Sequence, residues 1–195
     1  MRLFPTAKSK RWLRHAFTAA ELSLVTALLS SIPISSYTKV RQKAYQTQCV
    51  SHLRNIAMAL SMFRDENGHF PKAKFFTRNP NDPRSIRNQL APYGAGNKSM
   101  WICPALPSAF QKYGCTFLYN DELGGKNNAP NPSQTWVLIE ITCVNGKLPY
   151  PHPDGFNILY ADGSVRTTRK LPADILRNRK AQIKQIVDEM VAAGF

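Results

Sequence analysis

The sequence predicts an α+β fold in which a long helix comes first, a small set of β-strands follows and a second helix ends the chain. Apolar residues recur at helical spacing over residues 37–65, and they do so again after residue 171. Between these stretches, short apolar or β-branched runs lie on both sides of an Asp-Gly turn. With 195 residues, 43% of them hydrophobic, the chain is long and apolar enough for one modest folded domain and is not a disordered chain.

The first 38 residues have the layout of an export signal that is not an ordinary one. Residues 1–16 carry five basic side chains and no acidic one, namely Arg2, Lys8, Lys10, Arg11 and Arg14. An apolar stretch without charge follows over residues 22–38. Glu21 stands just before it, although a carboxylate costs about 2.5 to 3.5 kcal/mol at the centre of a bilayer. Glu21 is therefore a candidate functional residue that needs a partner, unless the segment is a degenerate signal anchor that tolerates an acid.

This apolar stretch is short and polar for a membrane helix. It has 17 residues, seven of which are Ser or Thr, whereas a spanning helix needs about 20 mainly apolar residues. Pro33 removes a helix hydrogen bond and predicts a kink at that point. We therefore expect weak anchoring in the membrane.

The stretch FTAAELSL, which follows Ala16, resembles the N-terminal signature of type IV pilins and type II secretion pseudopilins, [FM]-[ST]-x-x-E-[LM]. The resemblance implies that a prepilin peptidase cleaves between Ala16 and Phe17 and methylates the new N-terminal amine. Residues 1–16 are then the leader, and residues 17–38 are the membrane anchor and the assembly half of the helix. The resemblance also implies a partner for Glu21, which is the N-terminal amine of a neighbouring subunit. Ala16 replaces the usual Gly, and this is expected to slow cleavage.

Residues 37–65 predict one amphipathic helix. Its apolar stripe consists of Cys49, Leu53, Ile56, Leu60 and Phe63. Asn67-Gly68 is a C-terminal cap signal, and Pro71 prevents continuation of the helix. Together with the anchor, the helix spans nearly 50 residues, or about 70 Å at 1.5 Å per residue. A small domain is too short to cover it, so we expect lipid or sister subunits to bury one half.

Further stretches extend the resemblance to pseudopilin-like proteins that carry an H-x9-DG motif. The motif consists here of His152, Asp162 and Gly163, within HPDGFNILYADGSV. The other similar stretches are KVRQKAYQTQCVSHLRNIAMALSMFRDENGHFP, WICPALP, YGCTFLYNDELGG and NPSQTWVLIE. The resemblance covers residues 16 to about 170 and implies a pilin-like fold, in which the long helix packs on a small antiparallel sheet. It implies a globular domain over residues 39–170, which includes the second half of the helix, and a C-terminal helical extension over residues 171–195.

The local pattern places strands at residues 136–142 and 156–160. In ADGSVR, the pair Asp162-Gly163 predicts a hairpin between residues 157–161 and 164–168. Pro172 is suited to the first position of the C-terminal helix. The apolar face of that helix either packs on the sheet or faces a partner, and the sequence does not choose between them.

His152 and Asp162 invite a catalytic or metal-binding interpretation, which the sequence does not support. No third ligand stands at metal-like spacing and no nucleophile motif is present, and turn chemistry explains Asp162. We therefore expect a protein that is not an enzyme and has no cofactor, with His152 as a structural hydrogen-bonding residue. Asp154 and Asp162 are weak calcium candidates, because related pseudopilins use a loop calcium.

Four cysteines in an exported chain favour disulfides, and they allow three connectivities. The alternative is that some of them remain buried thiols. Cys49 and Cys103 stand where the relatives also carry Cys, whereas Cys115 and Cys143 do not. The resemblance therefore implies the pairs Cys49–Cys103, between the helix and the segment that leads into the sheet, and Cys115–Cys143, between two strands.

Charge and motifs leave two classes of function. Five of the 26 basic residues lie in the leader, so that 21 basic and 12 acidic residues remain, with a net charge of +9. The positive residues are scattered and no nucleic-acid-binding motif accompanies them, so we expect no nucleic acid partner. The resemblance implies a structural subunit of a pseudopilus or pilus-like fibre that serves type II secretion or adhesion. Its partners are sister subunits, the prepilin peptidase, the assembly machinery and the inner membrane, which it crosses once, with the globular domain in the periplasm or in an extracellular fibre. The alternative is a membrane-anchored periplasmic module that binds polysaccharide or DNA.

Overall fold

A computed structural model describes residues 19–30, 34–144, 146, 150–175 and 179–192. The chain divides into two compact units, Met1–Tyr37 and Thr38–Phe195, which are described separately. Helix α1 (Ala19–Ser30) belongs to the first unit, and the long helix α2 extends over Ile34–Asn67. The kink predicted near Pro33 and the cleavage site at Ala16 and Phe17 lie outside the described residues.

The prediction of an amphipathic helix over residues 37–65 is confirmed by α2. Cys49, Leu53 and Ile56 on its apolar stripe are completely buried. The helix ends at Asn67, and Gly68 follows with a φ of 73° and donates its N–H to the carbonyl of Arg64. A left-handed residue at this position favours glycine, which explains why the cap was visible in the sequence.

Four antiparallel strands form one sheet in the order β1-β2-β3-β4. They are β1 (Phe117–Tyr119), β2 (Trp136–Glu140), β3 (Phe156–Tyr160) and β4 (Val165–Thr168). The sequence did not predict β1. The strand expected over residues 136–142 ends at Glu140, because Ile141–Val144 forms a 3-10 turn, η4.

The predicted hairpin is confirmed by the pairing of β3 with β4. Phe156 lies opposite Thr168, and Leu159 lies opposite Val165. In the turn, Gly163 has a φ of 82°, and the carboxylate of Asp162 accepts hydrogen bonds from the backbone N–H and the hydroxyl of Ser164. Both residues of the Asp-Gly pair thus have the role that turn chemistry assigns to them.

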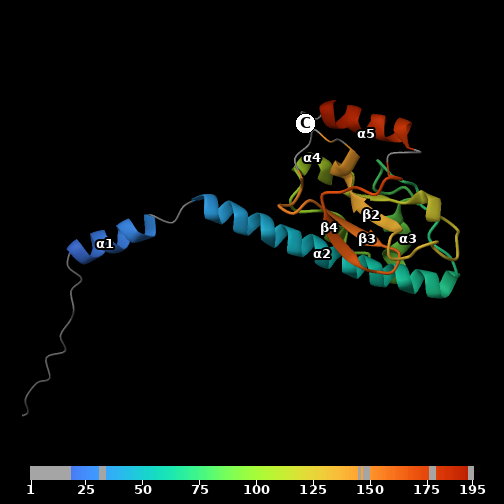
Figure 1. The fold of residues 1–195 in the computed structure, drawn as a ribbon, viewed down its shortest axis with the longest axis horizontal. Helices are drawn as coiled ribbons and strands as arrows, with labels where there is room; N and C mark the ends of the chain where they lie inside the picture. The colour runs from blue at the N-terminus through green and yellow to red at the C-terminus, as the bar shows by residue number, and fades with distance from the viewer. Residues whose placement is uncertain (1–18, 31–33, 145, 147–149, 176–178, 193–195) are drawn as a thin grey trace, which may run out of the picture. The chain divides into compact units, whose positions relative to one another are not determined.

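Short helical turns lie between α2 and β1, and one more lies between β1 and β2. They are α3 (Ile86–Leu90), η1 (Ala91–Tyr93), η2 (Lys98–Trp101), α4 (Ser108–Gln111) and η3 (Asp121–Leu123). Aromatic side chains from this part of the chain and from the sheet fill the core, among them Phe70, Phe75, Trp101, Tyr119 and Trp136. Figure 1 shows α2 along one side of the sheet and α5 on the other.

The C-terminal helix, α5, extends over Lys180–Ala192, so the prediction that it begins at Pro172 is wrong. Residues near Pro172 turn instead, and the indole N–H of Trp136 donates to the carboxylate of Asp174 at 2.9 Å. This contact holds the segment against the sheet before the helix begins. Ile186 and Met190 of α5 are buried, which decides that its apolar face packs on the domain. The fold is therefore α+β, with a long helix, a four-stranded antiparallel sheet and a C-terminal helix.

Candidate functional site

The N-terminal helix α1 exposes apolar side chains. Leu22 and Leu24 are each 63% exposed, and Val25 is 47% exposed. Glu21 lies in α1, but its side chain is outside the described part of the chain, as are Ala16 and Phe17. Among the described residues, no helix has the length and apolar character needed to cross a bilayer.

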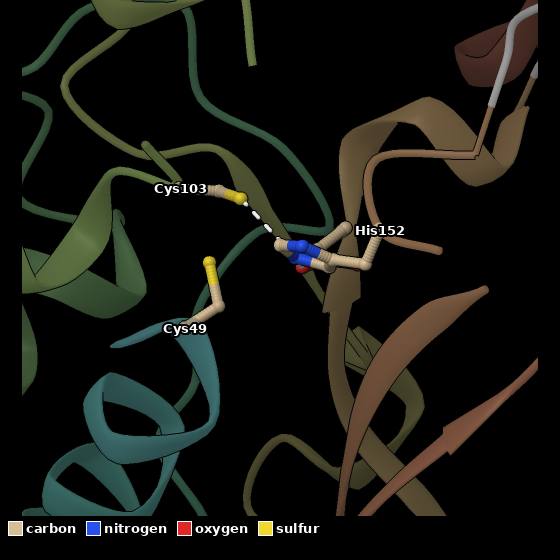
Figure 2. A group of neighbouring side chains, drawn as sticks. Cys49, Cys103 and His152 are labelled. Atoms are coloured by element: carbon tan, nitrogen blue, oxygen red, sulfur yellow. Dashed lines mark hydrogen bonds and ion pairs between the residues drawn. The ribbon is translucent and has the colours of Figure 1, made fainter. Parts of the chain in front are cut away.

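A second set of side chains meets inside the globular unit. Cys49 of α2, Cys103 after η2, Glu140 at the end of β2 and His152 before β3 each place one potential ligand atom within 4.8 Å of the others. All four residues are buried. Figure 2 shows the Cys103 sulfur facing the imidazole ring of His152, with the Cys49 sulfur on the adjoining side. We call these four residues the buried cluster.

Ordinary elements of the fold position each member of the buried cluster. Cys49 belongs to the buried stripe of α2, and the backbone N–H of Cys103 donates to the hydroxyl of Thr116 at 2.8 Å. Glu140 lies opposite Phe117 in the β1–β2 ladder. The position of His152 depends on a tight turn, because its carbonyl accepts the N–H of Gly155.

Gly155 is required where it stands. Its φ is 121°, and a Cβ atom built on it would lie 2.4 Å from the backbone oxygen of Thr168. Neither the backbone conformation nor the space accepts another residue. The turn that presents His152 is therefore locked against the end of β4.

Hydrogen bonds hold the carboxylate of Glu140 firmly. Its Oε1 lies 2.7 Å from His152 Nε2, which also lies 3.5 Å from Cys103 Sγ. The backbone N–H and the side-chain amide of Asn157 donate to the two carboxylate oxygens at 2.9 and 3.2 Å. Within the described part of the chain, the other ring nitrogen of His152, Nδ1, has no partner.

The buried cluster perturbs the titration of its own members. Burial lowers the pKa of His152, but the hydrogen bonds to Cys103 and Glu140 and the charge of Glu140 outweigh it and raise that pKa to about 9. The pKa of Cys103 is lowered, first by its hydrogen bond with Cys49, and the same contact raises the pKa of Cys49.

This arrangement is suited to three kinds of chemistry. Two neighbouring thiols can be oxidised to a disulfide, a thiolate and an imidazolium can form an ion pair, and two sulfurs, a nitrogen and a carboxylate can bind a metal ion. All four cysteines are buried free thiols in the structure. The pair Cys49–Cys103 is brought together, and its oxidation stays a prediction.

The pairing of the other two cysteines, Cys115 and Cys143, also stays a prediction. Cys115 precedes β1, and its thiol donates to the carbonyl of Phe117 at 3.3 Å. Cys143 lies in η4, beyond the end of β2. Burial raises the pKa of Cys115 to about 12 and also raises that of Cys143, so both are unreactive as thiols.

The weak calcium candidates Asp154 and Asp162 cannot share one ion. They lie beyond opposite ends of β3, whose five residues span roughly 13 to 17 Å at about 3.3 Å each. Asp154 pairs with Lys43 at 2.5 Å, and Asp162 is engaged with Ser164 in the hairpin turn. The expectation of a calcium ion held by both residues is therefore wrong.

Sequence reasoning missed that Glu140 and both cysteines converge on His152. The H-x9-DG motif had drawn attention to His152, and the pseudopilin resemblance had paired Cys49 with Cys103. Glu140 ends the stretch NPSQTWVLIE, which resembles the pseudopilin-like proteins, but the sequence assigned it no role. The missing third ligand was sought at short spacing along the chain, whereas the fold supplies it from distant segments.

Comparisons with protein-family models, with curated proteins and with solved structures found no match for this chain.

Proposed function

We propose that this chain is a prepilin-like structural subunit of a pseudopilus or pilus-like fibre, linked to type II secretion or adhesion. In this proposal a prepilin peptidase cleaves between Ala16 and Phe17 and methylates the new amine. Residues 17–38 then hold the protein in the inner membrane as a single pass, with a pilin-like globular domain on the periplasmic side. Assembly machinery transfers the subunit into a fibre through contacts between N-terminal helices.

The observation that carries the proposal is the contrast between the two helices. On α2, the apolar stripe around Leu53 and Ile56 is buried by the chain itself. On α1, Leu22, Leu24 and Val25 are exposed. We take these exposed apolar side chains as a surface that contacts lipid or another protein. In this proposal, lipid covers the exposed side chains of α1 before assembly, and the helices of sister subunits cover them after assembly.

Glu21 has the central role in this proposal. A buried amine and a buried carboxylate stabilise each other's charged states, and each is costly when its partner is absent. Pairing of Glu21 with the N-terminal amine of a neighbour therefore favours one register between subunits. The charge has no comparable use in a binding module that needs residues 17–38 only as an anchor.

The test compares Glu21→Gln with Glu66→Gln, the same change at an exposed position near the end of α2. A single cysteine at Leu24 reports contact between neighbouring N-terminal helices through oxidative cross-linking, measured at equal membrane abundance. We expect Glu21→Gln to reduce cross-linking sharply, because an unpaired buried charge costs about 3 to 5 kcal/mol for each subunit added. Glu66→Gln should cross-link like the parent chain.

Equal cross-linking in Glu21→Gln would contradict the assembly role and favour the binding module. Processing is tested separately by the intact mass of membrane-extracted protein. We expect loss of residues 1–16 and the gain of one methyl group. A chain that begins near Ser36 would indicate an ordinary signal peptidase and would contradict the proposal.

A further inference from the structure

We infer that the buried cluster of Cys49, Cys103, Glu140 and His152 is a binding site for a divalent transition metal, with zinc as the best fit. The metal would link α2 to the loop after η2, the end of β2 and the turn before β3. This inference concerns the globular unit alone and does not depend on the fibre proposal.

The donor set is the first argument. Two cysteine sulfurs, an imidazole nitrogen and a carboxylate oxygen are the ligands that structural and catalytic zinc sites use. Thiolates disfavour magnesium and calcium, which require oxygen ligands. Four protein donors fill a tetrahedral site without leaving a position for water, which is typical of a structural metal site.

The geometry is the second argument. The four donor atoms lie within 4.8 Å of one another and come from four separate segments. Zinc bonds of about 2.0 to 2.3 Å in a tetrahedron separate the ligand atoms by about 3.3 to 3.8 Å. The pair His152 Nε2 and Glu140 Oε1, now 2.7 Å apart, would open by about 0.6 Å when the metal replaces the shared proton.

The third argument is that a metal accounts for all four residues. The Cys49–Cys103 disulfide that the resemblance implies is the competing alternative. It would use only the two sulfurs and would leave an ion pair of Glu140 and His152 buried beside them. Burial of an ion pair is costly and does not by itself stabilise a fold. Asn157 donates two hydrogen bonds to Glu140 and thus fixes its orientation, as outer-shell partners do for metal-bound carboxylates.

Metal binding can be written so that charge and protons balance. The divalent ion displaces whichever protons the two thiols and the imidazolium carry, and these protons leave to solvent. The product has two thiolates, one carboxylate and one neutral imidazole around the ion, with a net charge of −1. No oxidant or reductant is needed.

The test uses the full chain, purified in detergent with a reductant and then supplied with zinc or cobalt alone. We expect about one zinc ion per chain by elemental analysis. We expect the cobalt form to show thiolate-to-metal charge transfer and the ligand-field bands of a tetrahedral site. Cys49→Ser and His152→Gln should lower the affinity at least about 100-fold. Cys115→Ser and Cys143→Ser are matched controls, since both residues are buried thiols outside the cluster, and they should bind like the parent chain.

Three results would overturn the inference. The first is a reduced parent chain that binds neither ion, and the second is a cobalt spectrum without thiolate charge transfer. The third is protein recovered from the periplasm with Cys49 and Cys103 joined in a disulfide and no metal bound. Should a cluster variant fail to fold, the cobalt spectrum of the parent chain decides the question. Protection of two thiols from alkylation by zinc in the parent chain provides a second decisive measurement.

Discussion

Replacement of Arg179 is expected to weaken the attachment of the C-terminal helix to the domain. Its guanidinium donates to the carboxylate of Asp121 at 2.7 and 3.0 Å and to the side-chain carbonyl of Asn120 at 3.0 Å. The group also lies over the rings of Phe75 and Trp136, at 5.1 and 5.4 Å from their centroids. It thus connects the residue that precedes α5 to β2 and η3.

The expected loss of stability depends on which partner of the ion pair is buried. The side chain of Arg179 is 3% exposed, whereas the side chains of Asp121 and Glu122 are 31% and 45% exposed. Removal of one partner from a fully buried pair costs about 3 to 5 kcal/mol. Because the carboxylates left behind by Arg179→Gln regain water, we expect a loss of about 2 to 3 kcal/mol in the free energy of unfolding.

The assay is urea denaturation of the full chain in detergent, followed by tryptophan fluorescence. Trp136, which contacts the guanidinium, and Trp101 are both buried, so the fluorescence reports unfolding of the core around this site. The control is Arg166→Gln, since Arg166 and Asp162 form an exposed pair at 3.9 Å, and such pairs contribute about 0 to 1 kcal/mol. High salt should leave the effect of Arg179→Gln nearly unchanged, because buried pairs are screened weakly.

A stability of Arg179→Gln within about 0.5 kcal/mol of the parent chain would refute this reasoning. It would mean that the other contacts of α5 are enough to attach it, namely the packing of Ile186 and Met190 and the contacts of Glu189 with Tyr113 and Arg78. An equal loss in Arg166→Gln would show that the assay responds to net charge and not to the buried contact.

Two further predictions concern glycine and acid stability. Gly155→Ala should lower the free energy of unfolding by at least about 3 kcal/mol, because the new Cβ meets a backbone oxygen at 2.4 Å. Gly163→Ala should lower it by only about 1 to 2 kcal/mol. The φ of Gly163 is also positive, but nothing lies within 4 Å of the new Cβ. Equal losses in the two variants, measured by urea denaturation, would contradict the steric argument. Hydrogen bonds from Lys74 and from a backbone N–H hold the pKa of Asp82 below its ordinary value. Asp82 therefore stabilises the fold at pH values above the ordinary pKa of an aspartate. This contribution is lost as the pH falls through the lowered pKa. Asp82→Asn should therefore be less stable than the parent chain at neutral pH, and the difference should shrink in acid; a difference that grows in acid would show the sign to be wrong.

The sequence by itself determined the elements whose signals are local. The spacing of Cys49, Leu53 and Ile56 identified α2, and Asn67-Gly68 marked its end, because helix period and cap chemistry depend on a few neighbouring residues. The β3–β4 hairpin followed in the same way from Asp162-Gly163. The fold class was predictable for this reason.

Sequence patterns did not predict element boundaries correctly where a contact with a distant segment determines them. The C-terminal helix begins at Lys180 and not at Pro172, because Asp174 is held by the indole of Trp136. The three-residue strand β1 has no periodicity of its own and exists because β2 pairs with it. Helix and strand ends depend on such tertiary contacts more than on propensity.

The buried cluster was decided by the tertiary structure alone. His152 was visible as a motif residue, but Glu140 looked like the end of an apolar strand, and nothing in the sequence placed its carboxylate 2.7 Å from that imidazole. Convergence of α2, β2 and two loops depends on the packing of the whole core, which no pattern of neighbouring residues encodes. The reverse holds for Glu21. The sequence around it indicates its role, but the partner that we propose lies on another chain, and the fold of one subunit therefore does not contain it.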